Sequence, residues 1–366
     1  MPDRSILVIN TGSSSLKYGL YGEHNGEEQL RFGGSAQNGT IDLSDGNDRV
    51  LRSEKLKIAT QAEALDHATK WLAEFASTKP CAIGHRIVHG GPRLVTHQRI
   101  TPALIEELRN CIHFAPLHIP LALQLIERAG RCYPEIPQFA CFDTAFHQTM
   151  PESATRFALP EELFDEGIRR FGFHGLSYES IVHQLGAKLP SRTVIAHLGS
   201  GASLAAVKDG RSVDTTMALT PTAGIPMATR SGDLDPGVLL YLQRVKQMSA
   251  DSLEQLLNHN SGLKALSGGT PDMRDLETAA DGGDQRAQLA IEIFCTSIRK
   301  TIAAYAAVLG GLDLLVFAGG IGEHSARIRT TVCEGVQFLG IFSVLVVPSQ
   351  EDRQIARHCR SLLSAS

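Results

Sequence analysis

The stretch that decides the fold is Ile6-Leu7-Val8-Ile9-Asn10-Thr11-Gly12-Ser13-Ser14-Ser15-Leu16-Lys17, close to the start of the chain. Its apolar half is typical of a buried strand, and apolar residues return over 16–21. Gly12 permits a positive φ, and N–H groups in such a turn can converge on an anion. The pattern predicts a hairpin whose tip contacts phosphate. Asn, Gly and Ser are also ordinary turn residues, so this stretch alone leaves a plain turn open.

Composition narrows the class of protein. A chain of 366 residues suggests two domains or one large α/β unit, and 43% hydrophobic with 20% charged residues is normal for a globular enzyme. A formal charge of -4 argues against nucleic acid as a partner. The seven cysteines form no CxxC pair, which favours free thiols in a reducing compartment. No signal peptide and no membrane span is recognised, so we expect a cytoplasmic protein.

Strand-like and helix-like segments alternate, which predicts an α/β fold. The expected helices are 60–77, 101–112, 119–129 and 286–309, the last as a long buried helix that includes Leu289 and Ile293. The expected strands are 5–9, 16–21, 81–88, 138–142, 194–197, 202–207, 314–318 and 344–347. The Gly-rich stretch 33–48 is interpreted as hairpin turns, and the polar stretch 149–170 as a boundary between domains.

An internal echo links the two halves of the chain. A strand–turn–strand pattern occurs at 6–21 and again at 194–207, which suggests two similar domains. A third Gly-rich turn, 318–322, follows a strand and precedes a helix expected near Ser325. None of these turns has the Walker spacing. Three such turns suit a nucleotide held in a cleft.

Polar side chains stand where strands are expected to end, which is where α/β sheets place ligand groups. Arg86 lies in Gly84-His85-Arg86-Ile87-Val88-His89, and Asp143 directly follows the strand 138–142. Arg230 and His174 lie in glycine-containing segments. An exposed ion pair remains an alternative for Arg86, and a structural histidine for His118.

Taken together, these segments resemble the acetate kinase family. The matching segments, in the family's order and across almost the whole chain, are VINTGSSSLKY, GHRIVHGG, FAPLH, FDTAFHQTMP, RRFGFHGLSY, HLGSGAS, DTTMALTPTAGIPMATRSGDLDPG, SGLKALSG, DMRDL and FAGGIGEHSARIR. The family belongs to the superfamily of actin, sugar kinases and heat-shock-chaperone ATPases. The resemblance implies two related α/β domains of the actin-like (ribonuclease H-like) type around a nucleotide cleft, and a homodimer. It places the first domain at 1–148 plus 353–366 and the second at 149–352.

The resemblance also implies a reaction, the reversible transfer of the γ-phosphoryl group of ATP to acetate, giving acetyl phosphate and ADP. It implies Mg²⁺, with Mn²⁺ as a substitute. The chemistry suits the residue types, because a carboxylate with a pKa near about 4.3 is ionised at neutral pH and needs no general base. The obstacle is repulsion between two anions, which fixed cations relieve.

Roles transfer by motif position. The residues that resemble the catalytic group are Arg86, Asp143, His174, Arg230 and His118. Those that match the acyl pocket, with Arg86, are Val88, Leu117, Phe173 and Pro221; for Val88 and Phe173, ordinary core positions remain an alternative. Those that match the metal site are Asn10 and Glu351. Those that match the nucleotide site are Ser13, Ser15, Lys17, His197, Leu198, Gly199, Ser200, Gly201, Asp272, Met273, Arg274, Gly319, Gly320, Ile321, Gly322 and His324. A helix N-terminus is the alternative for Asp272.

The chain departs from the family pattern at Ser200 and His324, where asparagine is frequent, and at Ala228, where glycine is usual. It is also shorter between 341 and 344 than most relatives. Three rival functions stay open: a propionate kinase, an ATP-binding protein without a small acceptor, and a sugar or glycerol kinase. Val88 favours acetate over propionate, because propionate users tend to carry a smaller side chain there.

Overall fold

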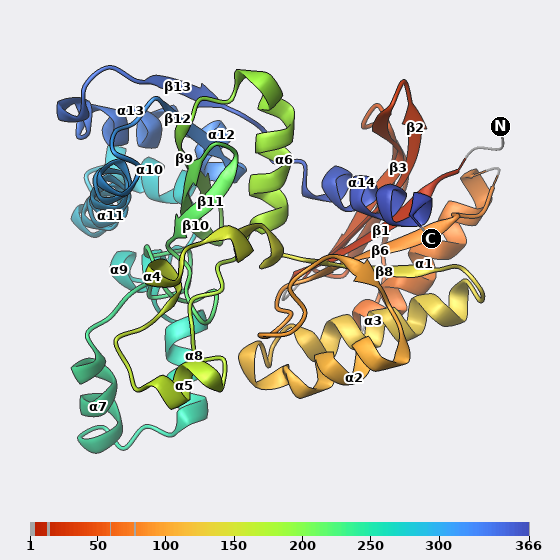
Figure 1. The fold of residues 1–366 in the computed structure, drawn as a ribbon, viewed down its shortest axis with the longest axis horizontal. Coiled ribbons are helices and arrows are strands. Elements are labelled where there is room, and N and C mark those ends of the chain that lie inside the picture. Colours follow the sequence, from red (N-terminus) through yellow and green to blue (C-terminus); the bar gives the residue numbers. More distant parts are fainter. Residues whose placement is uncertain (1–3, 13–14, 59, 77, 366) are drawn as a thin grey trace. The chain divides into compact units, whose positions relative to one another are not determined.

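The computed structural model describes residues 4–365 except 13–14, 59 and 77. The chain divides into two compact units (Figure 1). Unit 1 comprises Met1–Ala145, Gly175–Ser180 and Gln350–Ser366, and unit 2 comprises Phe146–His174 and Ile181–Ser349. Each unit is built on one mixed sheet, so the chain is a mixed α/β protein with two sheets.

The sheet of unit 1 has the order β5-β4-β3-β2-β1-β6-β8-β7 in the described residues. Its strands are β1 (Ile6–Thr11), β2 (Ser15–His24), β3 (Glu27–Gln37), β4 (Thr40–Asp45), β5 (Val50–Lys55), β6 (Ala82–Ile87), β7 (Gln98–Arg99) and β8 (Gln138–Phe142). β1 and β2 are antiparallel, whereas β6 lies parallel to β1 and β8 parallel to β6. The predicted hairpin is confirmed, with Asn10 opposite Lys17.

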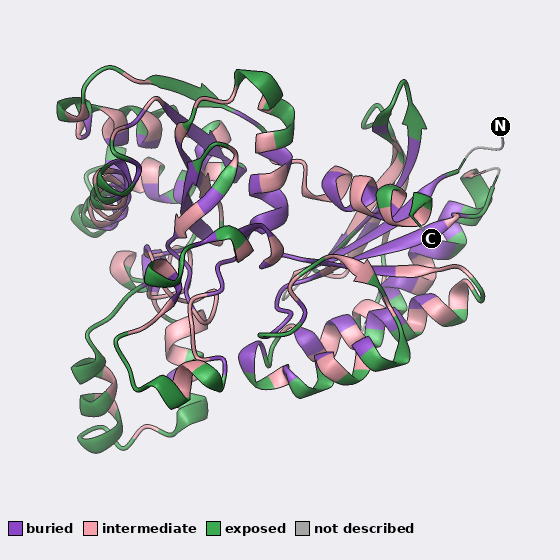
Figure 2. Cartoon of the chain, viewed as in Figure 1, coloured by how far each residue is buried: buried purple, intermediate pink, exposed green. Residues whose placement is uncertain are grey.

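Three helices of unit 1 follow the predicted segments 60–77, 101–112 and 119–129, whereas the C-terminal helix of the unit was not predicted. The helices of the unit are α1 (Gln61–Phe75), α2 (Pro102–Asn110), η1 (Ile112–Phe114), α3 (Ile119–Cys132) and α14 (Glu351–Ser364). Thr60 and Thr101 cap α1 and α2 through their hydroxyls, which accept hydrogen bonds from backbone N–H groups. α1 and α3 pack on one cluster of buried residues with Leu7 and Ile9, and α14 packs on another with Ile6 and Val8. β1 is therefore buried on both faces (Figure 2).

The sheet of unit 2 repeats the order of the centre of the first. Its strands are β9 (Arg192–Leu198), β10 (Ala202–Lys208), β11 (Arg211–Thr215), β12 (Leu314–Ala318) and β13 (Ser343–Val346), in the order β11-β10-β9-β12-β13. β9 and β10 form an antiparallel hairpin, and β12 lies parallel to β9, as β6 does to β1. The two similar strand–turn–strand patterns in the sequence therefore correspond to the same strand arrangement in the two sheets.

Helices and short 3-10 turns make up the rest of unit 2. They are η2 (Ala145–Thr149), α4 (Glu152–Thr155), α5 (Glu161–Asp165), η3 (Gly186–Lys188), α7 (Pro236–Arg244), α8 (Ala250–His259), α9 (Gly262–Ser267), α10 (Met273–Asp281), α11 (Gln285–Leu309), α12 (Gly319–His324), α13 (Ala326–Glu334) and η4 (Gln337–Leu339). Ala145 itself is counted with unit 1, and α6 (Gly175–Leu185) has its first residues in unit 1 and its last in unit 2. In the described chain, no helix is long and apolar enough to cross a membrane.

Two helical expectations need comment. Within the long helix α11, Leu289 was expected to be buried but is 50% exposed, because the buried stripe runs through Ile291, Phe294 and Ile298 instead. α13 begins where a helix was expected, with Ser325 as its N-cap. The glycine-rich segment before it, expected as a turn, is itself the short helix α12.

The interpretation of 33–48 as hairpin turns was wrong for most of that stretch. β3 continues through Gly33 and Gly34 to Gln37, and β4 covers Thr40–Asp45. Glycine is used there for space rather than for a turn. A Cβ on Gly34 would overlap the carbonyl oxygen of Asp42 and stand 2.7 Å from Oη of Tyr18, which donates a hydrogen bond to that oxygen.

Gly34→Ala should therefore destabilise unit 1. We expect a loss of about 1–3 kcal/mol in the free energy of unfolding, the usual cost of overpacking, measured as a lower urea midpoint. Gly33→Ala is the matched control, because its Cβ would touch only the flexible side chain of Leu30. Equal midpoints for the two variants would contradict the packing argument.

Candidate active site

Arg86 is the centre of a buried polar group in unit 1. It lies near the end of β6, and Asp143 directly follows the neighbouring parallel strand β8. Nε of Arg86 donates to both carboxylate oxygens of Asp143 at 3.1 and 3.0 Å, and Nη2 donates to Oδ2 at 2.6 Å. The Asp143 side chain is 1% exposed and that of Arg86 16%. The exposed-ion-pair alternative for Arg86 is therefore wrong.

The charges of this pair are set by burial and by each other. Burial acts to lower the pKa of Arg86, but the carboxylates of Asp143 and Glu351 outweigh it and the pKa is raised. Arg86 is therefore a permanent cation. Burial raises the pKa of Asp143, and Arg86 opposes that shift. The two groups thus hold each other in charged form away from water.

Asn10 links this pair to the helix α14. Its Oδ1 accepts a hydrogen bond from Nη1 of Arg86 at 3.2 Å. Its Nδ2 donates to Oδ1 of Asp352 at 2.6 Å and lies 3.4 Å from Oε2 of Glu351. β1, β6, β8 and α14 therefore meet in one hydrogen-bonded group.

The acidic pair at the start of α14 suits a magnesium ion. Mg²⁺ prefers oxygen ligands and is usually held by one or two carboxylates together with phosphate oxygens. Burial raises the pKa of Asp352, the hydrogen bond from Asn10 lowers it and neighbouring Glu351 raises it. Two crowded carboxylates are an unfavourable charge arrangement that a divalent cation would relieve.

The second polar group lies in unit 2, around the tip of the β9–β10 hairpin. His174 has a left-handed backbone, with φ of 58°, which is uncommon outside glycine and typical of functional sites. Its Nδ1 is 2.9 Å from Oγ of Ser203 on β10, and its ring lies 4.4 Å, centroid to centroid, from that of His197. This hydrogen bond orients the His174 ring, whose Nε2 lies on the side away from Ser203.

Gly201 leaves space between His174 and Arg230. A Cβ at Gly201 would lie 3.3 Å from Nε2 of His174 and 3.5 Å from Nη1 of Arg230. The same Nη1 donates to the carbonyl oxygen of Pro221 at 3.2 Å. A histidine nitrogen and a guanidinium thus border one small space beside a glycine, which is an arrangement suited to an anion.

Backbone hydrogen bonds hold the loop 227–230, which carries Arg230 and is called the arginine loop here. Met227 N–H donates to the carbonyl oxygen of Arg230, and Ala228 N–H donates to that of Ser200. Gly262, with φ of 60°, lies so close to the loop that a Cβ would overlap the carbonyl oxygen of Met227. The loop therefore has a fixed path, and Ala228 fits it without glycine.

The tip of the β9–β10 hairpin and the start of α12 lie side by side, because β9 pairs with β12 and His197 stands opposite Ala318. A Cβ on Gly199 would lie 3.9 Å from the backbone nitrogen of Gly320. The side chain of Glu323 accepts hydrogen bonds from the backbone N–H groups of Gly319 and Ser349, and so fixes the start of α12.

The other predicted site residues divide between the units. Unit 1 holds the remaining hairpin residues, of which Lys17 is exposed, Ser15 is partly exposed and Ser13 lies outside the described residues. It also holds His118, which is the N-cap of α3, together with Val88, which is buried, and Leu117, which is exposed. Unit 2 holds Phe173, Pro221, Leu198, Met273, Ile321, Gly322 and His324. Phe173 and Leu198 are buried.

Asp272 and Arg274 have a structural part in unit 2. Asp272 caps α10 by accepting from the backbone N–H of Arg274 at 2.9 Å, and it pairs with that guanidinium at 2.8 Å. Hydrogen bonds from Arg274 lower the pKa of Asp272 to about 2. The helix N-terminus that the sequence offered as an alternative is therefore present.

Sequence reasoning missed two residues of these polar groups, Asp352 and Ser203. Asp352 makes a shorter bond to Asn10 than Glu351 does, and Ser203 orients His174. Asp352 was adjacent to a selected residue, so a wider reading of the first turn of α14 would have found it. Ser203 carries no sequence signal beyond its place in the matched segment HLGSGAS.

The two sheets share one order over their central strands, and orienting contacts hold Arg86 and His174 in place. Comparison with known proteins gives the particular family. The chain belongs to the acetokinase family, whose model matches residues 5–357.

Individual relatives match over nearly their full length. The acetate kinase of Methylocella silvestris is 41% identical over 404 residues, covering 98% of each chain. The crystal structure of Porphyromonas gingivalis acetate kinase has 34% identity and a TM-score of 0.88, covering 98% of this chain and 99% of that one. A propionate kinase structure from Francisella tularensis has 34% identity and a TM-score of 0.92, with the same coverage.

Asp352→Asn should stabilise the metal-free protein at neutral pH. The pKa of Asp352 is raised by burial, so its charge destabilises the fold increasingly as pH rises through that raised pKa. The amide removes the charge and keeps an oxygen for Asn10. We expect a higher urea midpoint than wild type at pH 7, and a difference that shrinks in acid, where the carboxyl is protonated in both states. A lower midpoint at pH 7 would contradict this account.

Proposed function

We propose that the protein is an acetate kinase, which transfers the γ-phosphoryl group of ATP directly and reversibly to acetate with Mg²⁺. The observation that carries the proposal is the family match over residues 5–357, which includes Arg86, Asp143, His174 and Arg230. ATP is the phosphoryl donor, and acetyl phosphate and ADP are the products. A sugar or glycerol acceptor would need a carboxylate base, whereas Asp143 is already engaged by Arg86.

Charge is the obstacle that this reaction has to overcome. Acetate is an anion, and the phosphoryl group it attacks belongs to a polyanion. Two like unit charges 4 Å apart repel by about 4 kcal/mol at an effective dielectric near 20. Rate therefore depends on cations held in advance where charge accumulates. We propose Arg86 and Arg230 as those cations.

Arg86 suits an acceptor carboxylate. Guanidinium has five N–H donors, and Asp143 and Asn10 engage Nε, Nη2 and Nη1. Nη1 and Nη2 each have a second N–H for a substrate oxygen. Asp143 acts by orienting Arg86 rather than by taking a proton.

Arg230 and His174 suit the transferred group. Both border the space beside Gly201, where phosphoryl oxygens would accept hydrogen bonds from Nη1 and Nε2. We propose His118, the N-cap of α3 in unit 1, as a supporting histidine in the reaction. The turns 197–203 and 319–322 would receive the nucleotide through backbone N–H groups. Asn10, Glu351 and Asp352 would hold Mg²⁺, which neutralises phosphate charge when bound.

Arg86→Ala and Arg230→Ala should each fold and bind ATP but lose about 10³–10⁵ in kcat for acyl phosphate formation. The measurement is hydroxylamine trapping of the acyl phosphate, with ATP binding followed by calorimetry.

The matched controls are Arg128→Ala in unit 1 and Arg192→Ala in unit 2, whose arginines pair with Asp66 and Asp313 away from the proposed site residues. Both should keep near-normal turnover. Normal turnover in Arg86→Ala and Arg230→Ala would overturn the mechanism.

Propionate is the second candidate acceptor, because a propionate kinase structure matches this chain with a TM-score of 0.92. Acetate is favoured by Val88, a branched side chain that is 8% exposed directly after β6. One methylene in an apolar pocket changes the discrimination between acetate and propionate by only about 1–3 kcal/mol. A single substitution in the pocket can therefore change which acid is preferred.

Val88→Ala should shift the ratio of kcat/KM for propionate over acetate upward by roughly tenfold. The loss of both γ-methyl groups of Val88 leaves room for the extra methylene of propionate. Val50→Ala, at a position 60% exposed on β5, serves as the control. An unchanged ratio in Val88→Ala would remove Val88 from the acyl pocket.

We further propose that the protein has two domains, 1–148 plus 353–366 and 149–352, and works as a homodimer. A domain that includes 353–366 is supported by α14, which packs on Ile6 and Val8. A reducing, cytoplasmic setting is supported by its seven cysteines, which are all free.

A further inference from the structure

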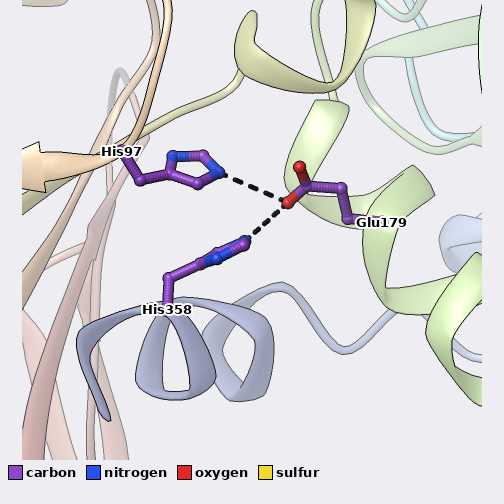
Figure 3. Close-up of side chains that lie close together, drawn as sticks. All are labelled: His97, Glu179 and His358. Atoms are coloured by element: carbon purple, nitrogen blue, oxygen red, sulfur yellow. Dashed lines mark hydrogen bonds and ion pairs between the residues drawn. The ribbon is translucent and has the colours of Figure 1, made fainter. Parts of the chain in front are cut away.

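Three side chains with metal-binding atoms lie together in unit 1, in a group that the proposed reaction does not use. His97 precedes β7, Glu179 lies on α6 and His358 lies on α14 (Figure 3). Oε2 of Glu179 is 2.7 Å from Nε2 of His358 and 3.5 Å from Nε2 of His97. One ligand atom from each residue lies within 4.8 Å of the others. We call this group the His97–Glu179–His358 cluster.

The cluster places a carboxylate among imidazoles. Burial acts to raise the pKa of Glu179, but hydrogen bonds from His358 and His97 outweigh it and lower the pKa to about 2. Burial lowers the pKa of His358, so its ring is neutral near pH 7. A carboxylate that is 19% exposed beside two imidazole nitrogens is a donor set that a metal cation can occupy.

The donor set and spacing suit zinc. Two imidazole nitrogens and one carboxylate oxygen are an established zinc donor set, with a fourth position open to water. For metal–ligand distances of about 2.0–2.2 Å, tetrahedral ligands stand about 3.4 Å apart. The pair Glu179–His97 is already at that spacing, and the pair Glu179–His358 would open by about 0.7 Å. The imidazole rings are tilted by 43° with centroids 3.9 Å apart.

We propose that the His97–Glu179–His358 cluster binds a divalent transition-metal ion of the zinc type, through Nε2 of each histidine and Oε2 of Glu179. The side chains are 11%, 19% and 23% exposed in chain order, which leaves an approach for the ion and for a water ligand. The donors are nitrogen-rich, which favours zinc over magnesium.

Binding would change the hydrogen bonds around both histidines. Nδ1 of His97 accepts a hydrogen bond from the backbone N–H of Phe142 at 3.0 Å, so the neutral ring has its proton on Nε2. The ion takes that position, the proton moves to Nδ1, and the bond from Phe142 is lost. The amide of Gln354, 3.0 Å from Nε2 of His358, would turn away. Losing one buried hydrogen bond costs roughly a tenth to a fifth of the free energy with which a structural zinc ion binds. Metal binding therefore outweighs the loss of this bond.

The ion would act on the position of α14. It would join that helix to α6 and to the segment before β7. The first residues of α14, Glu351 and Asp352, face Asn10, and the cluster lies farther along the same helix. A tie at His358 would fix the whole helix against unit 1.

The test uses the full-length protein, freed of metal with a chelator and titrated with Co²⁺ and Zn²⁺. Wild type should show the visible absorption of a cobalt ion bound by nitrogen and oxygen, and its melting temperature should rise with Zn²⁺. Glu179→Gln and His358→Gln should bind Zn²⁺ roughly tenfold or more weakly in calorimetry. His24→Gln, an exposed histidine of unit 1, should bind like wild type.

Absence of the cobalt absorption in wild type would overturn the proposal, whatever the variants do. Equal Zn²⁺ affinity in wild type and Glu179→Gln would also overturn it, because the ion would then bind elsewhere, as at Asn10 and Glu351. Thiolate-to-cobalt absorption would assign the ion to cysteines instead and would be equally fatal.

Discussion

The ion pair between Arg86 and Asp143 connects the fold of unit 1 to its chemistry. It follows from the parallel pairing of β6 and β8, because carboxyl ends of parallel strands meet at one edge of a sheet. Removing one partner of such a buried pair leaves an uncompensated charge, which is far more costly than losing an exposed pair. The same guanidinium reaches Asn10 on β1, and Asn10 reaches the first turn of α14. These hydrogen bonds connect β6, β8, β1 and α14 through Arg86 and Asn10.

Unit 2 orients its arginine and histidine by contacts other than the ion pair of unit 1. Nη1 of Arg230 donates a hydrogen bond to the carbonyl oxygen of Pro221. The carbonyl bond orients the arginine without neutralising it. His174 is oriented by a hydroxyl and has a strained backbone. Unit 2 thus offers an arginine and a histidine beside Gly201, whereas unit 1 offers an arginine tied to a carboxylate.

Much of this could be predicted from the sequence, and the reasons are physical. Strands such as 138–142 and 314–318 are short apolar runs buried on both faces, so their bounds were predicted to the residue. Gly33 and Gly34 led to the wrong prediction of turns over 33–48. In a sequence, a glycine that is needed for close packing looks the same as one that is needed for a turn. Arg86 and Asp143 were found because strand ends and family motifs agree. His97, Glu179 and His358 were missed, because only folding brings together residues so far apart in sequence.

The central claim is that the acceptor is a carboxylate, placed by a fixed arginine. The most direct measurement incubates the wild-type protein with ATP and Mg²⁺, adds either acetate or glycerol, and traps acyl phosphate with hydroxylamine. The account predicts hydroxamate and matching ADP with acetate, and neither with glycerol. Phosphorylation of glycerol without hydroxamate from acetate would contradict it.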